Sequence, residues 1–292
     1  MPDEHGNRKK LSMDVPVILE IPITATIGTD FLTGEKIENV LLKSREKKFK
    51  DNRVKGVLLT INSPGGGVNA SDQIYKLLKA YKKEYKVPIY AYIDGICASG
   101  GYYIACASDK IYSTDVSLIG SIGVLSWPPF FNVKDLMEKV GVEALTVIAG
   151  KGKDDMNPFR KWQEGESDHY RQLIDFFYAT FVNVVTTSRP QIANDLLVNT
   201  YGAQVFPAPQ ALKDGFIDIV GASRSEVLKE LALAAGIKES QNYQVISFQQ
   251  KSFYEKLFET KSPLLTGKLI HALELPKTWN CHQGVPFSYL YQ

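Results

Sequence analysis

Short apolar runs rich in β-branched residues alternate with helical patterns from Val15 onward, and this alternation limits the fold more than any other feature of the sequence. The runs that predict strands are VPVILEIPI (15–23), VKGVLLTI (54–61) and VPIYAYID (87–94). The helical pattern between the last two consists of Ile74, Leu77, Leu78, Tyr81 and Tyr85, with lysines on the opposite face. Ser71 could serve as the N-cap of this helix. Strand, crossover and strand in this order predict an α/β fold with a twisted, mostly parallel sheet flanked by helices.

Three regions divide the chain of 292 residues. Residues 1–14 are polar and predict a flexible tail. Residues 15–240 predict one α/β domain, which includes an apolar helical stripe at 170–185 and, near its end, a helix with a capping box of Ser223 and Glu226. Residues 241–292 mix helical and extended patterns and are interpreted as a C-terminal extension.

The bulk composition excludes several classes of protein. The formal net charge is only +2, which gives no reason to expect a nucleic-acid partner. The three cysteines have no metal-ligand spacing, and their odd number argues against a disulfide framework. The most apolar N-terminal run, residues 15–23, is too short to span a membrane and contains Glu20, so it predicts a buried strand instead.

Two glycine-rich turns each follow a predicted strand: SPGGG at 63–67 and ASGG at 98–101. Open α/β sheets place their sites at the carboxyl ends of strands, where such turns present free N–H groups. Gly66 and Gly100 are the natural pair of donors for an oxyanion. The alternatives for SPGGG are a plain turn or a phosphate-binding loop, although the lysine and spacing of the common phosphate motifs are missing.

Ser99 lies in the second turn, and two interpretations of it stay open at this stage. It could cap the following helix, as many serines do, or it could be a nucleophile. A nucleophilic serine needs a base, and the histidines available are few: His5, His169, His271 and His282. None lies between Ser99 and residue 168, so a Ser-His-Asp triad is poorly supported.

Four motifs together resemble the signal peptide peptidase A family, also called protease IV. They are TINSPGGGV (60–68), ASGGYYIACASDKIY (98–112), IGSIGV (119–124) and GKGKDDMNP (150–158), and the resemblance extends to QALKDGFIDIVG (210–221). It implies a crotonase- and Clp-protease-like fold and catalysis by a Ser/Lys dyad without a metal or organic cofactor. It also implies homo-oligomers shaped as rings or domes.

Carried over residue by residue, the resemblance assigns five positions. Ser99 matches the nucleophile, Lys153 the general base, and Ser121 the serine that orients the base. Gly66 matches the oxyanion turn, and Gly100 follows the nucleophile as in Clp-type sites.

Of these five residues, the general base has to meet the most demanding physical condition. A lysine accepts a proton only as a neutral amine, which requires its pKa to fall by about three units from about 10.4, and burial away from carboxylates can produce such a shift. Lys151 is an alternative base, although the register set by Met156 favours Lys153. The neighbouring Asp154 and Asp155 must point away from the amine, because a carboxylate would favour its charged form.

The leading hypothesis is therefore a serine endopeptidase that cuts small or unfolded peptides. The resemblance implies substrates such as cleaved signal peptides and other apolar segments, presented in extended form beside a strand. One alternative is a crotonase-like acyl-CoA enzyme, for which Ser99 and Lys153 would be dispensable. Another is an inactive scaffold that binds peptides or membrane-associated partners. The chain is expected in the cytoplasm, with a membrane-anchored form whose anchor was removed as the alternative.

Two apolar segments have no role in the dyad. SWPPFF contains Trp127, Phe130 and Phe131, which predict a substrate groove, a subunit contact or core packing. The segment GVPFSYLYQ (284–292) is uncharged and extended in character. It is interpreted either as an ordinary packed strand or as an occupant of a groove.

Overall fold

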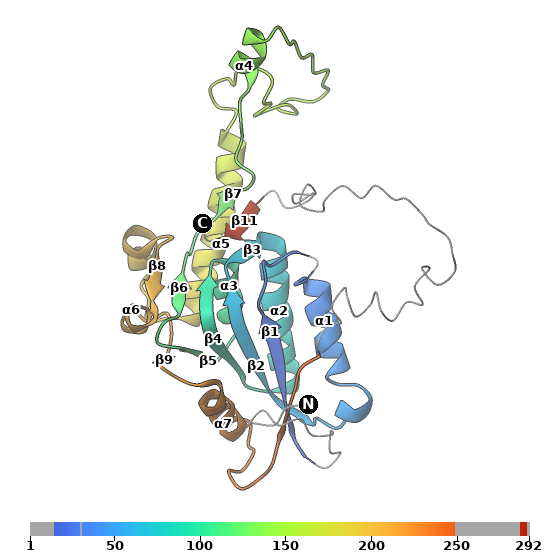
Figure 1. Cartoon of the computed structure of the whole chain (residues 1–292), viewed down its shortest axis with the longest axis vertical. Helices are drawn as coiled ribbons and strands as arrows, with labels where there is room; N and C mark the ends of the chain where they lie inside the picture. The colour runs from blue at the N-terminus through green and yellow to red at the C-terminus, as the bar shows by residue number, and fades with distance from the viewer. Residues whose placement is uncertain (1–14, 30, 249–286, 291–292) are drawn as a thin grey trace, which may run out of the picture.

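The main sheet is built mostly from parallel strands, as the alternating pattern predicts. The computed structural model describes residues 15–29 and 31–248, together with the backbone of residues 287–290. Its eight-stranded sheet has the order β10-β1-β2-β4-β5-β9, with β6 pairing in parallel with β4 and β8 pairing antiparallel with β6 (Figure 1). These strands are β1 (Val17–Ile23), β2 (Val54–Ser63), β4 (Ile89–Ala98), β5 (Lys110–Ser113), β6 (Leu118–Gly120), β8 (Val205–Pro207), β9 (Ile219–Val220) and β10 (Gln244–Ile246).

A second, three-stranded sheet lies at the end of the main sheet where the glycine turns are. It consists of β3 (Gly65–Gly67), β11 (Phe287–Leu290) and β7 (Leu125–Ser126), in that spatial order. β11 lies between the other two strands and runs antiparallel to both (Figure 1).

Helices cover both faces of the main sheet, which confirms the predicted α/β class. The helices are α1 (Gly34–Lys43), α2 (Val68–Tyr85), α3 (Gly100–Ala105), α4 (Lys134–Lys139), α5 (Asp168–Ser188), α6 (Ala208–Lys213) and α7 (Arg224–Ala234), with a 3-10 turn at Lys47–Phe49 and a π-helical turn at Leu196–Tyr201. Within β2, Val57 and Leu59 join the core beneath α1, α2, α3 and α5, whereas Leu58 joins a smaller core beneath α7. This period-2 alternation is the physical basis of the strand prediction.

Of the two N-caps that the sequence predicts, one is present in the structure and one is not. The capping box is present, since the Ser223 side chain accepts from the N–H of Glu226 and the Glu226 side chain accepts from the N–H of Ser223. The helix after the first glycine turn begins earlier than Ser71, the residue that the pattern predicts as its cap. Ser71 instead lies inside α2, where its buried hydroxyl donates to the carbonyl of Gly67.

The sheet also continues beyond residue 240, the predicted end of the main domain. β10 pairs in parallel with β1 through contacts such as Ile18 with Val245. Residues 244–246 are all buried, so they belong to the core of the main sheet. The three-region division otherwise stays a prediction, because residues 1–14 and most of 241–292 lie outside the described residues.

Residues 127–167, between β7 and α5, form an arm that projects away from the sheet together with the first turns of α5 (Figure 1). Every hydrophobic side chain of this arm is exposed or half-buried. Among the described residues, no helix is both long and apolar enough to cross a bilayer. The location of the protein in the cell stays a prediction.

Candidate active site

The ends of two neighbouring parallel strands bring Ser99 and Ser121 together. Ala98 of β4 is in register with Gly120 of β6, and the N–H of Ser99 donates to the carbonyl of Gly120 over 2.8 Å. Ser99 has φ 54° and ψ −120°, and Ser121 has φ 56°. Positive φ is costly for a residue with a side chain, and such strain is concentrated at functional sites.

The side chain of Ser99 has no structural role in the described part of the chain. Ser99 is completely buried and immediately precedes α3, but its hydroxyl does not cap that helix. Its Oγ has no hydrogen-bond partner among the described residues. The helix-cap interpretation is therefore wrong. Leaving a buried hydroxyl unpaired costs about 1–3 kcal/mol.

The two glycine turns meet beside Ser99. Gly66 has φ 155°, and a Cβ there would collide with the backbone of Ile27, so this position requires glycine. A Cβ on Gly100 would collide with Oγ of Ser71 and lie 3.3 Å from the amide nitrogen of Gly66. The absence of side chains thus lets the N-terminal end of α3 pack directly against β3.

Two tyrosines fix α3 behind Ser99. The hydroxyl of Tyr102 donates to the carbonyl of Phe216 over 2.8 Å, and the hydroxyl of Tyr103 donates to Asp72 Oδ1 over 2.9 Å. Both rings are buried. The two residues therefore anchor a short helix that could not be stable by itself.

The cysteines near Ser99 are poor nucleophiles. Cys97 and Cys106 are free and buried. Burial raises the pKa of the Cys97 thiol well above its ordinary value and raises the pKa of the Cys106 thiol to about 11. The thiolate is the reactive form, so Ser99 is the stronger candidate.

The two candidate lysines lie elsewhere. Lys153 and Lys151 are exposed and belong to the arm, in the stretch between α4 and α5 (Figure 1). The structure therefore brings Ser99, Ser121, Gly66 and Gly100 together, and it leaves the candidate base on a projecting segment. Within residues 15–29 and 31–248, neither of these two lysines is buried in the way that the dyad demands.

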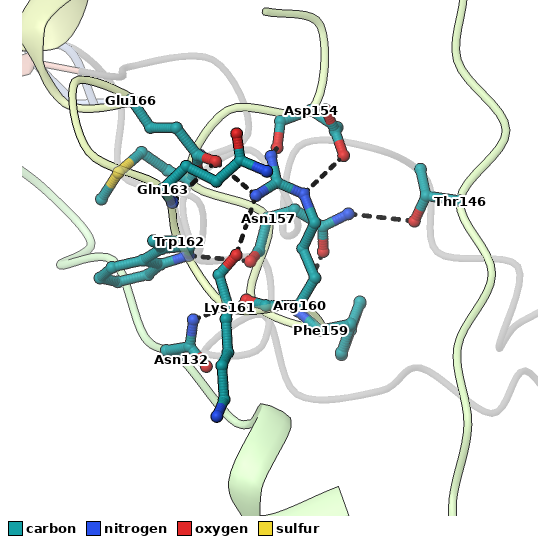
Figure 2. A network of polar contacts seen from close by, with 11 residues as sticks. Asn132, Thr146, Asp154, Asn157, Phe159, Arg160, Lys161, Trp162, Gln163 and Glu166 are labelled. Atoms are coloured by element: carbon teal, nitrogen blue, oxygen red, sulfur yellow. Dashed lines mark hydrogen bonds and ion pairs between the residues drawn. The ribbon is translucent and has the colours of Figure 1, made fainter.

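A polar network follows Lys153 and fixes the conformation of the arm (Figure 2). Arg160 Nε donates to Asp154 Oδ2 over 2.8 Å, and Arg160 Nη1 forms an ion pair with Glu166. The hydrogen bond from Arg160 is the main cause that lowers the pKa of both carboxyl groups. The Asp154 carboxylate is thus bound by an arginine instead of standing unpaired next to Lys153.

The same network ties distant parts of the arm together. Glu166 Oε2 accepts from the N–H of Met156 over 3.1 Å, and Trp162 Nε1 donates to the carbonyl of Asn157 over 2.8 Å (Figure 2). Asn157 Nδ2 donates to Thr146 Oγ1 over 3.0 Å. Sequence analysis missed this network because the residues are spaced irregularly in a loop, where no helical or strand period marks them.

The remaining sequence candidates contribute little to the site. His169 is exposed at the start of α5, and the other three histidines lie outside the described residues. Trp127, Phe130 and Phe131 are all exposed, so the core-packing alternative for SWPPFF is wrong. Phe130 contacts Tyr170 edge-on, with ring centroids 4.9 Å apart.

Two family models match parts of this chain. The model of peptidase family S49 matches residues 81–238, and the model of the NfeD1b N-terminal domain matches residues 18–127. A protein of Enterococcus faecium provisionally named signal peptide peptidase SppA is 38% identical over 222 residues, which cover 76% of this chain and 62% of the relative. A provisionally named protease of Methanocaldococcus jannaschii is 35% identical over 188 residues, which cover 64% of this chain and 58% of the relative.

The chain thus spans less than two thirds of the length of these two relatives. Among solved structures, a ClpP1 mutant from Listeria monocytogenes is similar with a TM-score of 0.46 and 16% identity, covering 73% of this chain and 94% of that one.

Proposed function

Because this chain belongs to peptidase family S49, we propose that it is a serine endopeptidase in which Ser99 is the nucleophile and Lys153 the general base. The observation that carries the proposal is the state of Ser99. Its hydroxyl is buried, unpaired and held in a strained conformation where two glycine turns meet. A folded protein has no structural reason to keep such a group.

In the proposed reaction, Ser99 Oγ attacks the scissile carbonyl carbon while its proton passes to the neutral amine of Lys153. The N–H groups of Gly66 and Gly100 stabilise the oxyanion of the tetrahedral intermediate. The protonated lysine then gives its proton to the leaving amine, and a water molecule hydrolyses the acyl-enzyme by the same route. Ser121, whose strand end lies beside that of Ser99, orients the lysine.

The position of the arm raises the question of which subunit supplies the lysine to a given Ser99. Lys153 is exposed, whereas the dyad needs a lysine that is buried against Ser99. The arm also exposes apolar side chains at 142–148, among them Leu145 and Val147, which are 90% and 87% exposed. We infer that the arm packs against a neighbouring copy in the homo-oligomer and delivers Lys153 to that copy's Ser99.

The proposed substrates are small or unfolded peptides with apolar segments, such as cleaved signal peptides. They would bind in extended form beside a strand, which provides recognition through backbone hydrogen bonds. A crotonase-like acyl-CoA reaction is disfavoured by membership of a peptidase family, and the complete set of dyad residues argues against an inactive scaffold. The ring or dome shape of the assembly stays a prediction from the resemblance.

The direct test uses a panel of fluorogenic peptides between pH 6 and 10. Ser99→Ala and Lys153→Met are expected to lose at least about a hundredfold in kcat, the range of general-base contributions. Lys151→Met is the matched control and should retain activity. Loss of activity in Lys151→Met with retention in Lys153→Met would assign the base to Lys151. Labelling by a serine-directed phosphonate should disappear in Ser99→Ala, fall strongly in Lys153→Met, which lacks the activating base, and persist in Lys151→Met.

Mixing two inactive variants tests delivery of the base by a neighbour. When Ser99→Ala and Lys153→Met subunits assemble randomly, a quarter of the sites should combine an intact serine with an intact lysine, so about 25% of the activity should return. The two variants are therefore dissociated, mixed and then reassembled, and each variant treated alone is the control. No recovery after verified subunit exchange would show that each chain supplies its own lysine.

A further inference from the structure

Ile27 holds β3, the strand that contains the proposed oxyanion donor Gly66. The N–H of Ile27 donates to the carbonyl of Gly65 over 2.8 Å, and the carbonyl of Ile27 accepts from the N–H of Gly67 over 2.8 Å. Main-chain groups of successive strand residues point to opposite sides, so the N–H of Gly66 faces away from Ile27. The amide nitrogen of Gly66 lies 3.3 Å from the position that a Cβ on Gly100 would occupy. The segment around Ile27 therefore determines how this N–H is directed beside the start of α3.

The hydroxyl of Ser63 connects the same segment to the turn that leads into β3. Ser63 is the last residue of β2 and is completely buried. Its Oγ donates to the carbonyl of Ala25 over 2.6 Å and accepts from the N–H of Gly65 over 3.2 Å. Pro64 has no N–H, so the N–H of Gly65 is the first donor of the turn. One hydroxyl thus joins the turn to a segment 38 positions away in the sequence.

Ser63 also contacts the turn that contains the second proposed donor. A Cβ on Gly101 would lie 3.1 Å from the carbonyl oxygen of Ser63 and 3.4 Å from its Cβ. The first turn of α3 therefore packs directly against Ser63. A change in the conformation of Ser63 would move the N–H of Gly66 relative to that of Gly100.

We propose that Ser63 is a positioning residue for the oxyanion site. Its hydroxyl fixes the turn at residues 63–65 and thereby holds the N–H of Gly66 where the oxyanion forms. Ser63 acts through β3 and does not itself contact the substrate. The inference rests on the proposed peptidase function, because only a reaction that forms an oxyanion needs this N–H in a fixed place. The competing interpretation is that Ser63 only stabilises the fold, as many buried and hydrogen-bonded serines do.

Ser63→Ala should lower kcat and leave KM nearly unchanged. The substitution removes the hydroxyl that binds both the carbonyl of Ala25 and the N–H of Gly65, so the turn should relax and displace Gly66. Loss of an entire oxyanion donor costs about 10²–10³ in kcat, so a donor that is displaced should cost about 10- to 100-fold. KM should change little, because the donor acts mainly on the transition state.

Two further variants separate positioning from a general loss of stability. Ser44→Ala removes another completely buried hydroxyl, which donates to the carbonyl of Leu41 over 2.5 Å and bonds the hydroxyl of Tyr81 over 2.8 Å. Tyr81 lies roughly 20 Å along α2 from β3, so this control should keep the kcat of the wild type. Ser63→Thr retains the hydroxyl on a residue that suits a strand, and it should recover most of the kcat lost in Ser63→Ala.

Affinity for a peptide aldehyde reports on the oxyanion site directly. Ser99 Oγ bonds to the aldehyde carbon, and the aldehyde oxygen becomes the hemiacetal oxygen, which occupies the oxyanion site and takes up the proton of the hydroxyl. The corresponding peptide alcohol binds without forming this bond. In Ser63→Ala the inhibition constant of the aldehyde should rise about 10- to 100-fold, in parallel with the fall in kcat/KM, and that of the alcohol should stay the same.

The inference is overturned if folded Ser63→Ala keeps the kcat of the wild type, or if it loses affinity for the aldehyde and the alcohol equally. If Ser63→Ala does not fold, Ser63→Cys takes its place, because a thiol forms only weak hydrogen bonds, and it should show the same pattern with a smaller loss. A wild type that hydrolyses no peptide would instead reject the peptidase function. An active wild type beside an equally active Ser63→Ala would reject only the role of Ser63.

Discussion

Replacing the proposed nucleophile should make the protein more stable, because Ser99 carries two separate costs. The first is its buried hydroxyl, which has no partner among the described residues. The second is its backbone, with φ 54° and ψ −120°, the conformation of the first central residue of a type II′ turn, where glycine dominates.

The two costs can be removed one at a time. Ser99→Ala removes the unpaired hydroxyl but keeps the strained backbone, and it should stabilise the fold by about 1 kcal/mol, the lower end of the penalty for an unpaired buried group. Ser99→Gly also relieves the strain, worth about 1–3 kcal/mol. Greater freedom of glycine in the unfolded state offsets about 0.5–1 kcal/mol of this, so we expect a further gain of about 1 kcal/mol.

Thermal and urea unfolding of the two variants and the wild type measures these differences at equal protein concentration. Each 1 kcal/mol should raise Tm by about 2–4 °C in a domain of this size. Ser117→Ala is the matched control, since Ser117 is also completely buried but donates its hydroxyl to the carbonyl of Ile93 over 3.0 Å. That change should destabilise the fold by about 1 kcal/mol.

The order of stability among Ser99→Ala, Ser99→Gly and the wild type tests whether both costs exist. If Ser99→Ala is less stable than the wild type, the hydroxyl has a stabilising partner and the argument for a functional role weakens. If Ser99→Gly is less stable than Ser99→Ala, the backbone at this position is not strained.

Gly100→Ala should destabilise the fold by about 1–3 kcal/mol, because its Cβ collides with Oγ of Ser71; the double variant with Ser71→Ala should recover at least about 1 kcal/mol in urea unfolding, and strictly additive effects would contradict this contact. Arg160→Ala releases the Asp154 carboxylate next to Lys153 and should move the pH midpoint of peptidase activity upward, since an unpaired carboxylate favours a charged amine. Arg160→Lys keeps the positive charge and should stay near the wild type, whereas a midpoint that is the same in all three proteins would show that Asp154 does not influence the base. The lowered pKa of Asp154 means that its ion pair stabilises the arm above about pH 4 and is lost as the pH falls through the lowered value, so limited proteolysis by an acid-active protease should cut the wild-type arm faster near pH 3 than at pH 5. In Arg160→Ala the rates at the two pH values should differ much less, after correction for the pH dependence of the protease on an unfolded substrate.

The sequence alone determined the elements whose signal is local. Alternating apolar residues in β2 and the helical spacing of Ile74, Leu78 and Tyr81 correctly predicted a mostly parallel α/β sheet. The prediction is possible because the residues of one buried face recur at a short, regular interval along a strand or a helix. The sequence also predicted the glycine turns, because a position such as Gly66 has a conformation and a close neighbour that only glycine tolerates.

Other features depended on contacts between residues far apart in the chain. No local pattern distinguishes a serine that caps a helix from one whose hydroxyl is unpaired, and the structure decided this for Ser99 through the position of α3 against β3. The sequence could not predict that Lys153 is exposed either, because a projecting arm and a buried loop have similar composition. The pairing of β11 with β3 joins residues that are more than 200 positions apart. Such pairing depends on which backbone edge is open in the folded molecule, and an open edge exists only after the rest of the chain has packed.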